Sequence, residues 1–147
     1  MIKQLKHAVA ASMMPMLAAL QFVVITATMC TIAQAAPLLR CQVTYAGTTH
    51  LVQASPGTDP YSAPSVEIGG RFRFKAVLLG SERQLDAINL YAYLDAKRQP
   101  ILIHQAKYLA PFKKSVAPYA LTGTNYLYAS NVERELQYSC TLQGVQS

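Results

Sequence analysis

Apolar and polar residues alternate with a period of two along most of the chain after residue 40. Successive side chains of a β-strand point to opposite faces, so this pattern predicts strands with one buried face and one solvated face. The C-terminal stretch is the clearest example, with an apolar set formed by Leu136, Tyr138, Cys140 and Leu142. The same pattern predicts seven strands, over residues 41–45, 48–52, 66–79, 88–94, 101–109, 126–128 and 134–142.

Glycine and proline mark the turns between these strands. Ala46-Gly47 predicts a tight hairpin between the first two strands, and residues 95–100 predict the turn of a second hairpin between the fourth and fifth. Gly69-Gly70 falls inside the third strand pattern and predicts a bulge or sharp bend there. Residues 54–64 and 110–123 contain several prolines and are predicted to be loops, the second being the longest irregular link.

Short strands separated by turn signals, in a domain of about 110 residues, predict an all-β fold. Within that class we expect a small antiparallel β-sandwich of immunoglobulin-like shape. The tryptophan that marks the core of immunoglobulin domains is missing, because the chain contains no Trp. The expectation therefore concerns the architecture alone.

The first 35 residues have the features of an export signal. A short basic head with Lys3 and Lys6 precedes a stretch from residue 8 to residue 39 that carries no formal charge. Ala33-Gln34-Ala35 supplies the small-residue site that signal peptidase accepts. We therefore expect cleavage near Ala35/Ala36, a single mature domain over residues 36–147, and a periplasmic or secreted location.

Two other roles for the N-terminal segment were considered. An uncleaved membrane anchor stays open as the alternative, because about 20 apolar residues can span a bilayer. Attachment of a lipid at Cys30 is rejected, because the preceding Ala27-Thr28-Met29 does not form the small-residue box that such attachment needs. If the signal is cleaved, we expect no transmembrane segment in the mature protein.

Cysteine usage agrees with an exported chain. Of the three Cys residues, Cys30 lies in the leader, which leaves Cys41 and Cys140 near the two ends of the mature domain. We expect a structural disulfide between them that ties the first strand to the last. Two free thiols or intermolecular pairing are the alternatives. Because no Cys-x-x-Cys spacing occurs, redox chemistry is not indicated.

The best-defined candidate surface is a row of cations in the third predicted strand. Arg71, Arg73 and Lys75 alternate with Phe72 and Phe74. The period of two places the cations on one face about 6.6 Å apart and turns the rings into the core. Such a row could bind an acidic protein or lipid headgroups. The alternative is a charged outer face that prevents pairing with neighbouring sheets.

Tyrosine supplies a second candidate surface. Tyr91 and Tyr93 share one strand face, and so do Tyr126 and Tyr128. Tyrosine on a sandwich can form a platform for sugar or peptide, since the ring contacts apolar surface while the hydroxyl forms hydrogen bonds. Tyrosine is also a common half-buried strand residue, which is the competing interpretation.

Candidates for catalysis or metal binding are few. Glu133 and Glu135 lie two residues apart on one strand, at a separation of about 6.5 Å that paired carboxylates use in glycoside hydrolysis. His50 and His104 are the imidazoles that follow the leader, and they show no metal-binding spacing. We expect a solvated strand face and half-buried histidines, with no catalytic residue, metal or cofactor.

These observations predict an exported, non-catalytic β-sandwich that binds or assists a protein or an anionic component of the cell envelope. Removal of Lys3 and Lys6 with the leader leaves 11 of the 13 Lys and Arg residues. Together with the 7 Asp and Glu residues they give the mature chain a net charge of +4. Mild basicity agrees with an anionic partner and equally with ordinary solubility. Nucleic-acid binding is not expected. The alternative function is a small-ligand or metal carrier, or a small hydrolase, with a pocket near the 110–123 link. The oligomeric state is left open.

Overall fold

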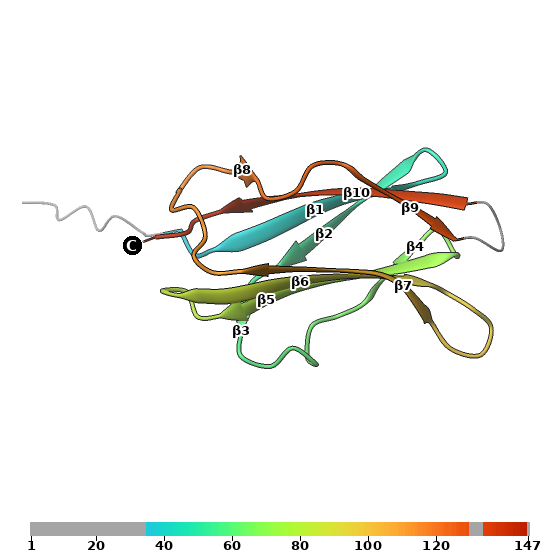
Figure 1. The fold of residues 1–147 in the computed structure, drawn as a ribbon, viewed down its shortest axis with the longest axis horizontal. Helices are drawn as coiled ribbons and strands as arrows, with labels where there is room; N and C mark the ends of the chain where they lie inside the picture. Colours follow the sequence, from blue (N-terminus) through green and yellow to red (C-terminus); the bar gives the residue numbers. More distant parts are fainter. Residues whose placement is uncertain (1–34, 130–133, 147) are drawn as a thin grey trace, which may run out of the picture. The chain divides into compact units, whose positions relative to one another are not determined.

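The computed structural model describes residues 35–129 and 134–146, and every regular element within them is a strand. The strands form two sheets that lie face to face, as predicted for a small β-sandwich (Figure 1). Their bounds are β1 Leu38–Tyr45, β2 Thr48–Ala54, β3 Pro56–Gly57, β4 Val66–Ile68, β5 Phe72–Gly80, β6 Leu85–Leu94, β7 Ile101–Leu109, β8 Tyr119–Ala120, β9 Asn125–Ala129 and β10 Arg134–Gln143.

The first sheet, sheet A, joins the two ends of the domain. β1 lies between β2 and β10, and both pairs are antiparallel. β8 and β9 pair in turn with β10. The β1–β2 hairpin confirms the predicted turn at Ala46 and Gly47, where φ is 49° and 80°. Positive φ at both central residues is what a two-residue hairpin turn of this kind requires.

The second sheet, sheet B, has the strand order β3-β5-β6-β7, and β4 also pairs with β5. β3 runs parallel to β5, whereas the other pairs are antiparallel. The β6–β7 hairpin confirms the second predicted turn. Its register shifts between Ala92 and Tyr93, which marks a bulge. β7 forms one edge of the sheet.

The predicted strand over residues 66–79 is two strands, β4 and β5. Gly69 and Gly70 adopt positive φ angles of 58° and 69°, and the N–H of Arg71 donates to the carbonyl of Ile68. The chain reverses here, so β4 pairs antiparallel with β5. The predicted bend is therefore a complete hairpin turn, because two consecutive glycines enter the left-handed region without a Cβ clash.

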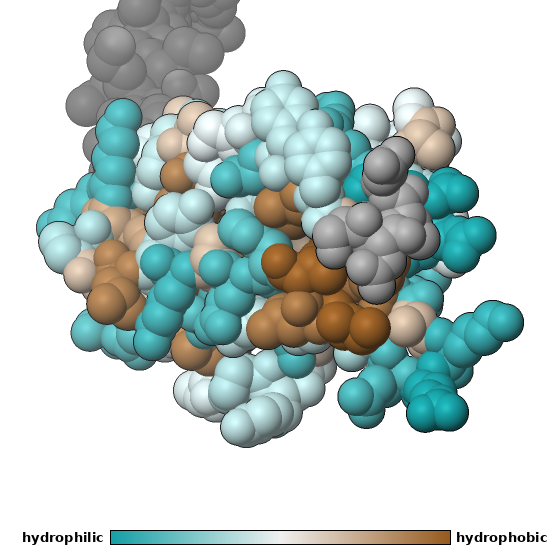
Figure 2. Space-filling model, turned by 45° about the vertical axis from the view of Figure 1, so that its right-hand side comes forward, coloured by the Kyte–Doolittle hydropathy of each residue, from teal (hydrophilic) through white to brown (hydrophobic). Residues whose placement is uncertain are grey.

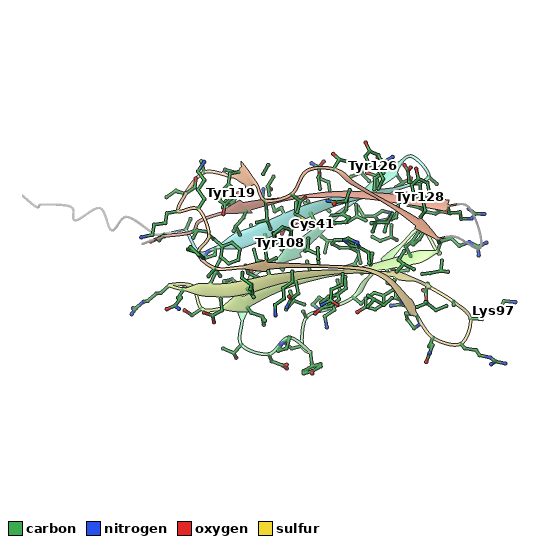
Figure 3. The ribbon with its side chains drawn as sticks, in the orientation of Figure 1. Cys41, Lys97, Tyr108, Tyr119, Tyr126 and Tyr128 are labelled. Carbon is green, nitrogen blue, oxygen red and sulfur yellow. A yellow bond between two sulfur atoms is a disulfide. The ribbon has the colours of Figure 1, made fainter. Side chains whose placement is uncertain are left out.

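Alternate residues of the strands fill the space between the two sheets, as the period of two predicted (Figure 3). Two aromatic pairs link the layers. Tyr45 of sheet A meets Phe72 of sheet B, and Tyr138 of sheet A meets Phe74 of sheet B, each with ring centroids 5.1 Å apart. Tilted and edge-to-face pairs of this kind stabilise a core beyond the area that they bury.

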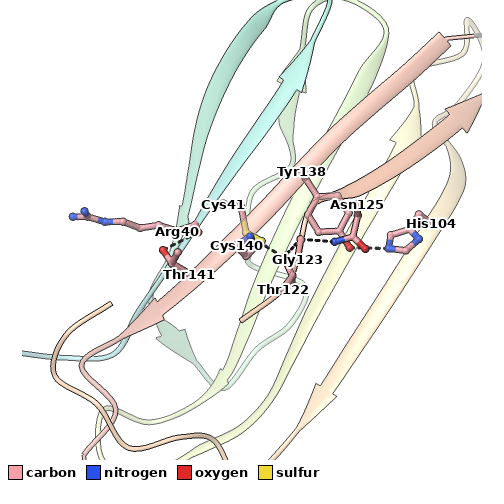
Figure 4. The surroundings of a disulfide bond; sticks show 9 residues. All are labelled: Arg40, Cys41, His104, Thr122, Gly123, Asn125, Tyr138, Cys140 and Thr141. Carbon is pink, nitrogen blue, oxygen red and sulfur yellow. Dashed lines mark hydrogen bonds between the residues drawn. A yellow bond between two sulfur atoms is a disulfide. The ribbon is translucent and has the colours of Figure 1, made fainter. Parts of the chain in front are cut away.

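The predicted disulfide between Cys41 and Cys140 is present, and it lies within sheet A. The two cysteines stand directly opposite each other on β1 and β10, with Cα atoms 4.0 Å apart. The N–H of Cys140 donates to the hydroxyl of Thr122 at 2.9 Å (Figure 4). Immunoglobulin domains bridge their two sheets, so this bridge departs from their pattern although the architecture is a sandwich.

The start of the described chain lies beside its end. The side chain of Gln146 donates to the carbonyl of Ala35 at 3.0 Å. Most of the predicted export signal, including Cys30, lies outside the described residues. In the ranges 35–129 and 134–146, the structure contains no helix long and apolar enough to cross a membrane.

Candidate functional site

The outer face of sheet B brings together four residues that the sequence indicated as surface candidates. Arg73 lies opposite Tyr93, and Lys75 lies opposite Tyr91, in the β5–β6 pair. The alternate residues of β5 are buried, which turns these four side chains away from the core. We call these four residues the sheet B face. Strand pairing thus merges two surfaces that the sequence presented separately.

Arg71 lies outside the strand that carries Arg73 and Lys75, contrary to the predicted single strand over residues 66–79. It lies in the turn before β5, which begins at Phe72. The glycine turn ends the extended backbone on its N-terminal side, so strand alternation starts only after Arg71. The predicted row of three cations is therefore reduced to Arg73 and Lys75.

Carboxylates from neighbouring segments share the sheet B face with its cations. The Nε atom of Arg73 donates to Oδ2 of Asp95 at 3.1 Å, and the two side chains are 37% and 26% exposed. On the other side of Arg73, its cross-strand neighbour on β4 is Glu67. The surface around Arg73 therefore has mixed charge. A partly exposed ion pair of this kind stabilises by only about 0–1 kcal/mol, so it can rearrange against a partner.

Tyr91 and Tyr93 form the aromatic part of the face. Their ring centroids are 6.3 Å apart and the ring planes differ by 24°, so the rings are stacked. Burial, and then the neighbouring Tyr91, raise the pKa of Tyr93. Like any tyrosine hydroxyl at neutral pH, that of Tyr93 can donate a hydrogen bond.

The face continues onto the edge strand β7, where Leu102 lies opposite Tyr93 and Gln105 lies opposite Tyr91. Leu102 and the preceding Ile101 are 49% and 50% exposed. Figure 2 brings the right-hand end of the Figure 1 view forward, and its broadest area of apolar surface lies near the middle of the view, with a smaller area at the left. The sequence pattern did not single out Ile101 and Leu102 as surface residues. The available signal was a pair of consecutive apolar residues in a strand, since only one of them can point into the core.

His104 forms a contact between the two sheets. Its Nε2 atom lies 2.9 Å from the hydroxyl oxygen of Tyr138, and both side chains appear in Figure 4. Burial lowers the pKa of His104 and raises the pKa of Tyr138 to about 12, with a smaller contribution from Tyr108. His50 lies on β2 in the other sheet. Over the described residues, no three or more His, Cys, Asp or Glu side chains cluster as a metal site would need.

We expect the His104 environment to make folding stability depend on pH. Burial disfavours the imidazolium ion, so the unfolded chain, with a histidine pKa near 6.5, binds more protons than the folded chain. This contribution is fully present above about pH 6.5 and is lost as the pH falls below it. Between pH 8 and pH 5, the free energy of unfolding measured in urea should therefore fall more steeply with decreasing pH for wild type than for His104→Gln. The same pH dependence of the free energy of unfolding in both proteins would contradict a contribution from His104.

The structure describes one of the two paired carboxylates that were weighed for catalysis. Glu133 lies outside the described residues. Glu135 accepts hydrogen bonds from the Tyr128 hydroxyl and from Nε2 of Gln137, the second at 2.5 Å. These bonds, that of Tyr128 first, lower the pKa of Glu135. The general acid of a glycosidase needs a raised pKa, so the environment of Glu135 acts in the opposite direction.

A pocket of about 250 Å³ lies beside the 110–123 link, where the alternative function expected one. Its lining combines apolar side chains such as Leu85 and Phe112 with the charged Glu82, Arg83 and Lys114. Small-molecule sites usually occupy about 300–1,000 Å³, so this pocket is small.

The fold and the sheet B face define a small, disulfide-bonded β-sandwich with an aromatic and charged outer surface. Comparison with known proteins gave no match to a family model, to a curated protein or to a solved structure.

Proposed function

We propose that the protein is an exported, non-catalytic binding module that contacts a protein partner through the sheet B face. The observation that carries this proposal is the register of β5, β6 and β7. It aligns Arg73, Tyr93 and Leu102 in one row and Lys75, Tyr91 and Gln105 in the next. Two adjacent rows of side chains on three strands form a continuous surface rather than scattered exposed residues.

The chemistry of this surface supports a protein partner over a purely anionic one. Tyr and Arg are enriched where proteins bind one another, and half-exposed apolar side chains such as Leu102 favour the same use. Asp95 and Glu67 beside Arg73 give the face both signs of charge. An anionic lipid surface or acidic polymer would meet repulsion there, whereas a protein can present complementary charges of both signs.

Export is part of the proposal. The N-terminal signal pattern and the disulfide between Cys41 and Cys140 both support an oxidising compartment outside the cytoplasm, such as a periplasm or the cell surface. Binding or accessory modules of an envelope assembly work in such a compartment, where a covalent bridge can persist.

Photo-crosslinking in the native host tests the proposal. A photoreactive benzophenone amino acid in place of Tyr91 or Leu102 should give an adduct of defined mass with a protein, because both positions lie on the proposed surface. Adding Lys75→Glu should lower the adduct yield several-fold, since a charge at the contact is reversed. Mass spectrometry of the purified adduct identifies the partner.

Leu51 provides the matched control for this experiment. It is 58% exposed on β2, which belongs to the sheet opposite the two rows of the sheet B face. The same photoreactive residue at position 51 should give no adduct. Equal yields from positions 51 and 91, or no adduct from positions 91 and 102, would count against the proposal.

A second candidate function, a small-ligand carrier, rests on the pocket beside the 110–123 link. Its volume of about 250 Å³ and its exposed charged lining make it the weaker candidate. We therefore prefer the sheet B face as the functional surface.

A further inference from the structure

The outer face of sheet A contains a second concave surface of different chemistry. A groove of about 170 Å³ is lined by Gln42, Thr44, Thr124, Gln137, Tyr138 and Ser139. Tyr138 turns its ring into the core, where it is 1% exposed. The other five, which we call the sheet A groove, carry amide or hydroxyl groups and no formal charge.

Strand register explains how these residues come together. Gln42 lies opposite Ser139, and Thr44 lies opposite Gln137, in the β1–β10 pair. They alternate with buried core residues on both strands, so their side chains share the outer face. The Thr44 hydroxyl also forms a 2.8 Å hydrogen bond with the hydroxyl of Thr49 on β2. The groove thus spans residues that are about 100 positions apart in the chain.

Two exposed tyrosine rings border this groove. Tyr126 and Tyr128 lie on β9, opposite Gln137 and Glu135 of β10, and they are 57% and 65% exposed. Figure 3 places both on the outer side of sheet A, near one end of β9 and β10. Large aromatic rings exposed on a strand, next to a polar groove, present an apolar surface beside hydrogen-bonding groups.

Hydrogen bonds to Glu135 hold Tyr128 and Gln137 in place. Glu135 accepts from the Tyr128 hydroxyl and from the side-chain amide of Gln137. The same bonds, that of Tyr128 first, lower the pKa of Glu135. Glu135 therefore orients the ring of Tyr128 and the side-chain amide of Gln137. Orientation before binding reduces the entropy that a ligand must overcome.

We propose that the sheet A groove, with Tyr126 and Tyr128, binds a neutral oligosaccharide. Sugar hydroxyls both donate and accept hydrogen bonds, and so do hydroxyl and amide side chains, which match them without a charge. The apolar face of a sugar ring packs against an aromatic ring, which the two tyrosines provide. A phosphate or carboxylate ligand would instead need cations, which the lining of this groove does not include. The inference concerns a surface and a ligand class distinct from those of the sheet B face.

Titration of the exported protein with neutral oligosaccharides tests the inference. The probes are hexamers of β-1,4-glucose, α-1,4-glucose, β-1,4-N-acetylglucosamine and β-1,4-mannose, followed by backbone amide NMR. At least one hexamer should shift the resonances of β1, β9 and β10 around the groove. Tyr126→Ala and Gln137→Ala should each weaken its affinity by about three- to tenfold, the loss expected for one aromatic or hydrogen-bonding contact.

Controls on other surfaces separate this inference from the proposed function. Tyr61→Ala removes an equally large but more exposed ring and should leave sugar affinity unchanged. Lys75→Glu changes the sheet B face and should also leave it unchanged, so either proposal can fail without the other. The inference is overturned if no hexamer shifts the groove resonances at about 10 mM sugar. It is also overturned if Tyr126→Ala and Gln137→Ala bind a shifting hexamer as tightly as wild type.

Discussion

Replacing both Cys41 and Cys140 with Ala is expected to lower the free energy of unfolding by about 4–5 kcal/mol. The bridge joins residues 99 positions apart, so its removal returns much conformational freedom to the unfolded chain. For a domain of about 110 residues, the melting temperature should fall by about 15–20 °C. Chemical denaturation and thermal scans of the purified, oxidised protein measure the two quantities.

Reduced wild-type protein is the matched control, because it loses the bond but keeps both sulfur atoms in the core. Its melting temperature should approach that of the double Ala variant. Intact-mass analysis of the oxidised protein should give the chain beginning near Ala36, less two hydrogen atoms. A double variant with the melting temperature of wild type would contradict the stabilising role of the disulfide. A disulfide-linked dimer would contradict the intramolecular pairing.

Phe74→Ala is expected to lower the free energy of unfolding by about 3–5 kcal/mol. Phe74 is fully buried, and its ring lies 5.1 Å from that of Tyr138 on the opposite sheet. Truncation removes the transfer free energy of the ring and leaves a cavity between the two layers, which the surrounding close-packed side chains fill only in part. Urea unfolding monitored by circular dichroism measures the change.

Tyr61→Ala is the control for that substitution. It also truncates a large aromatic side chain, but one that is 89% exposed, so stability should change by no more than about 0.5 kcal/mol. If Phe74→Ala were as stable as Tyr61→Ala, the ring would not belong to the core that links sheets A and B. In that case the outward direction of Arg73 and Lys75 would lose its basis as well.

Strand alternation was sufficient to predict the fold class, because each long strand has one face in a shared core. The apolar positions predicted on the last strand are all buried. The hairpin turns at residues 46–47 and 95–100 were also predictable, since turn chemistry is local. The disulfide was predictable by elimination, because two cysteines remain once Cys30 is assigned to the leader.

The candidate surfaces were only partly predictable. A period of two tells which face of its own strand a residue occupies, but it does not tell which strand lies beside it. The neighbourhood of Arg73 and Tyr93, and that of Gln42 and Ser139, follow from long-range pairing. The cations and tyrosines of sheet B are therefore separate features in the sequence, and the sheet A groove has no sequence signal.

Arg71 shows the limit of alternation at a strand end. Its spacing from Arg73 is correct for one face, yet the turn at Gly69 and Gly70 removes it from the strand. The two glycines allowed either a bulge or a full reversal, and local sequence does not choose between them. The pairing of β4 with β5 made the choice, because the hairpin satisfies backbone hydrogen bonds of both segments.

By itself, the sequence determined that this protein is a β-structure with one-sided strands and a cysteine pair, whereas the export role of its N-terminal segment stays a prediction. These properties depend on residue type and short spacing alone. The tertiary structure decided that the bridge lies within one sheet, that Arg73 meets Asp95, and that Tyr126 stands beside Gln137. Those contacts join residues from separate strands, and strand order arises from burying all the apolar faces together, which no single segment encodes.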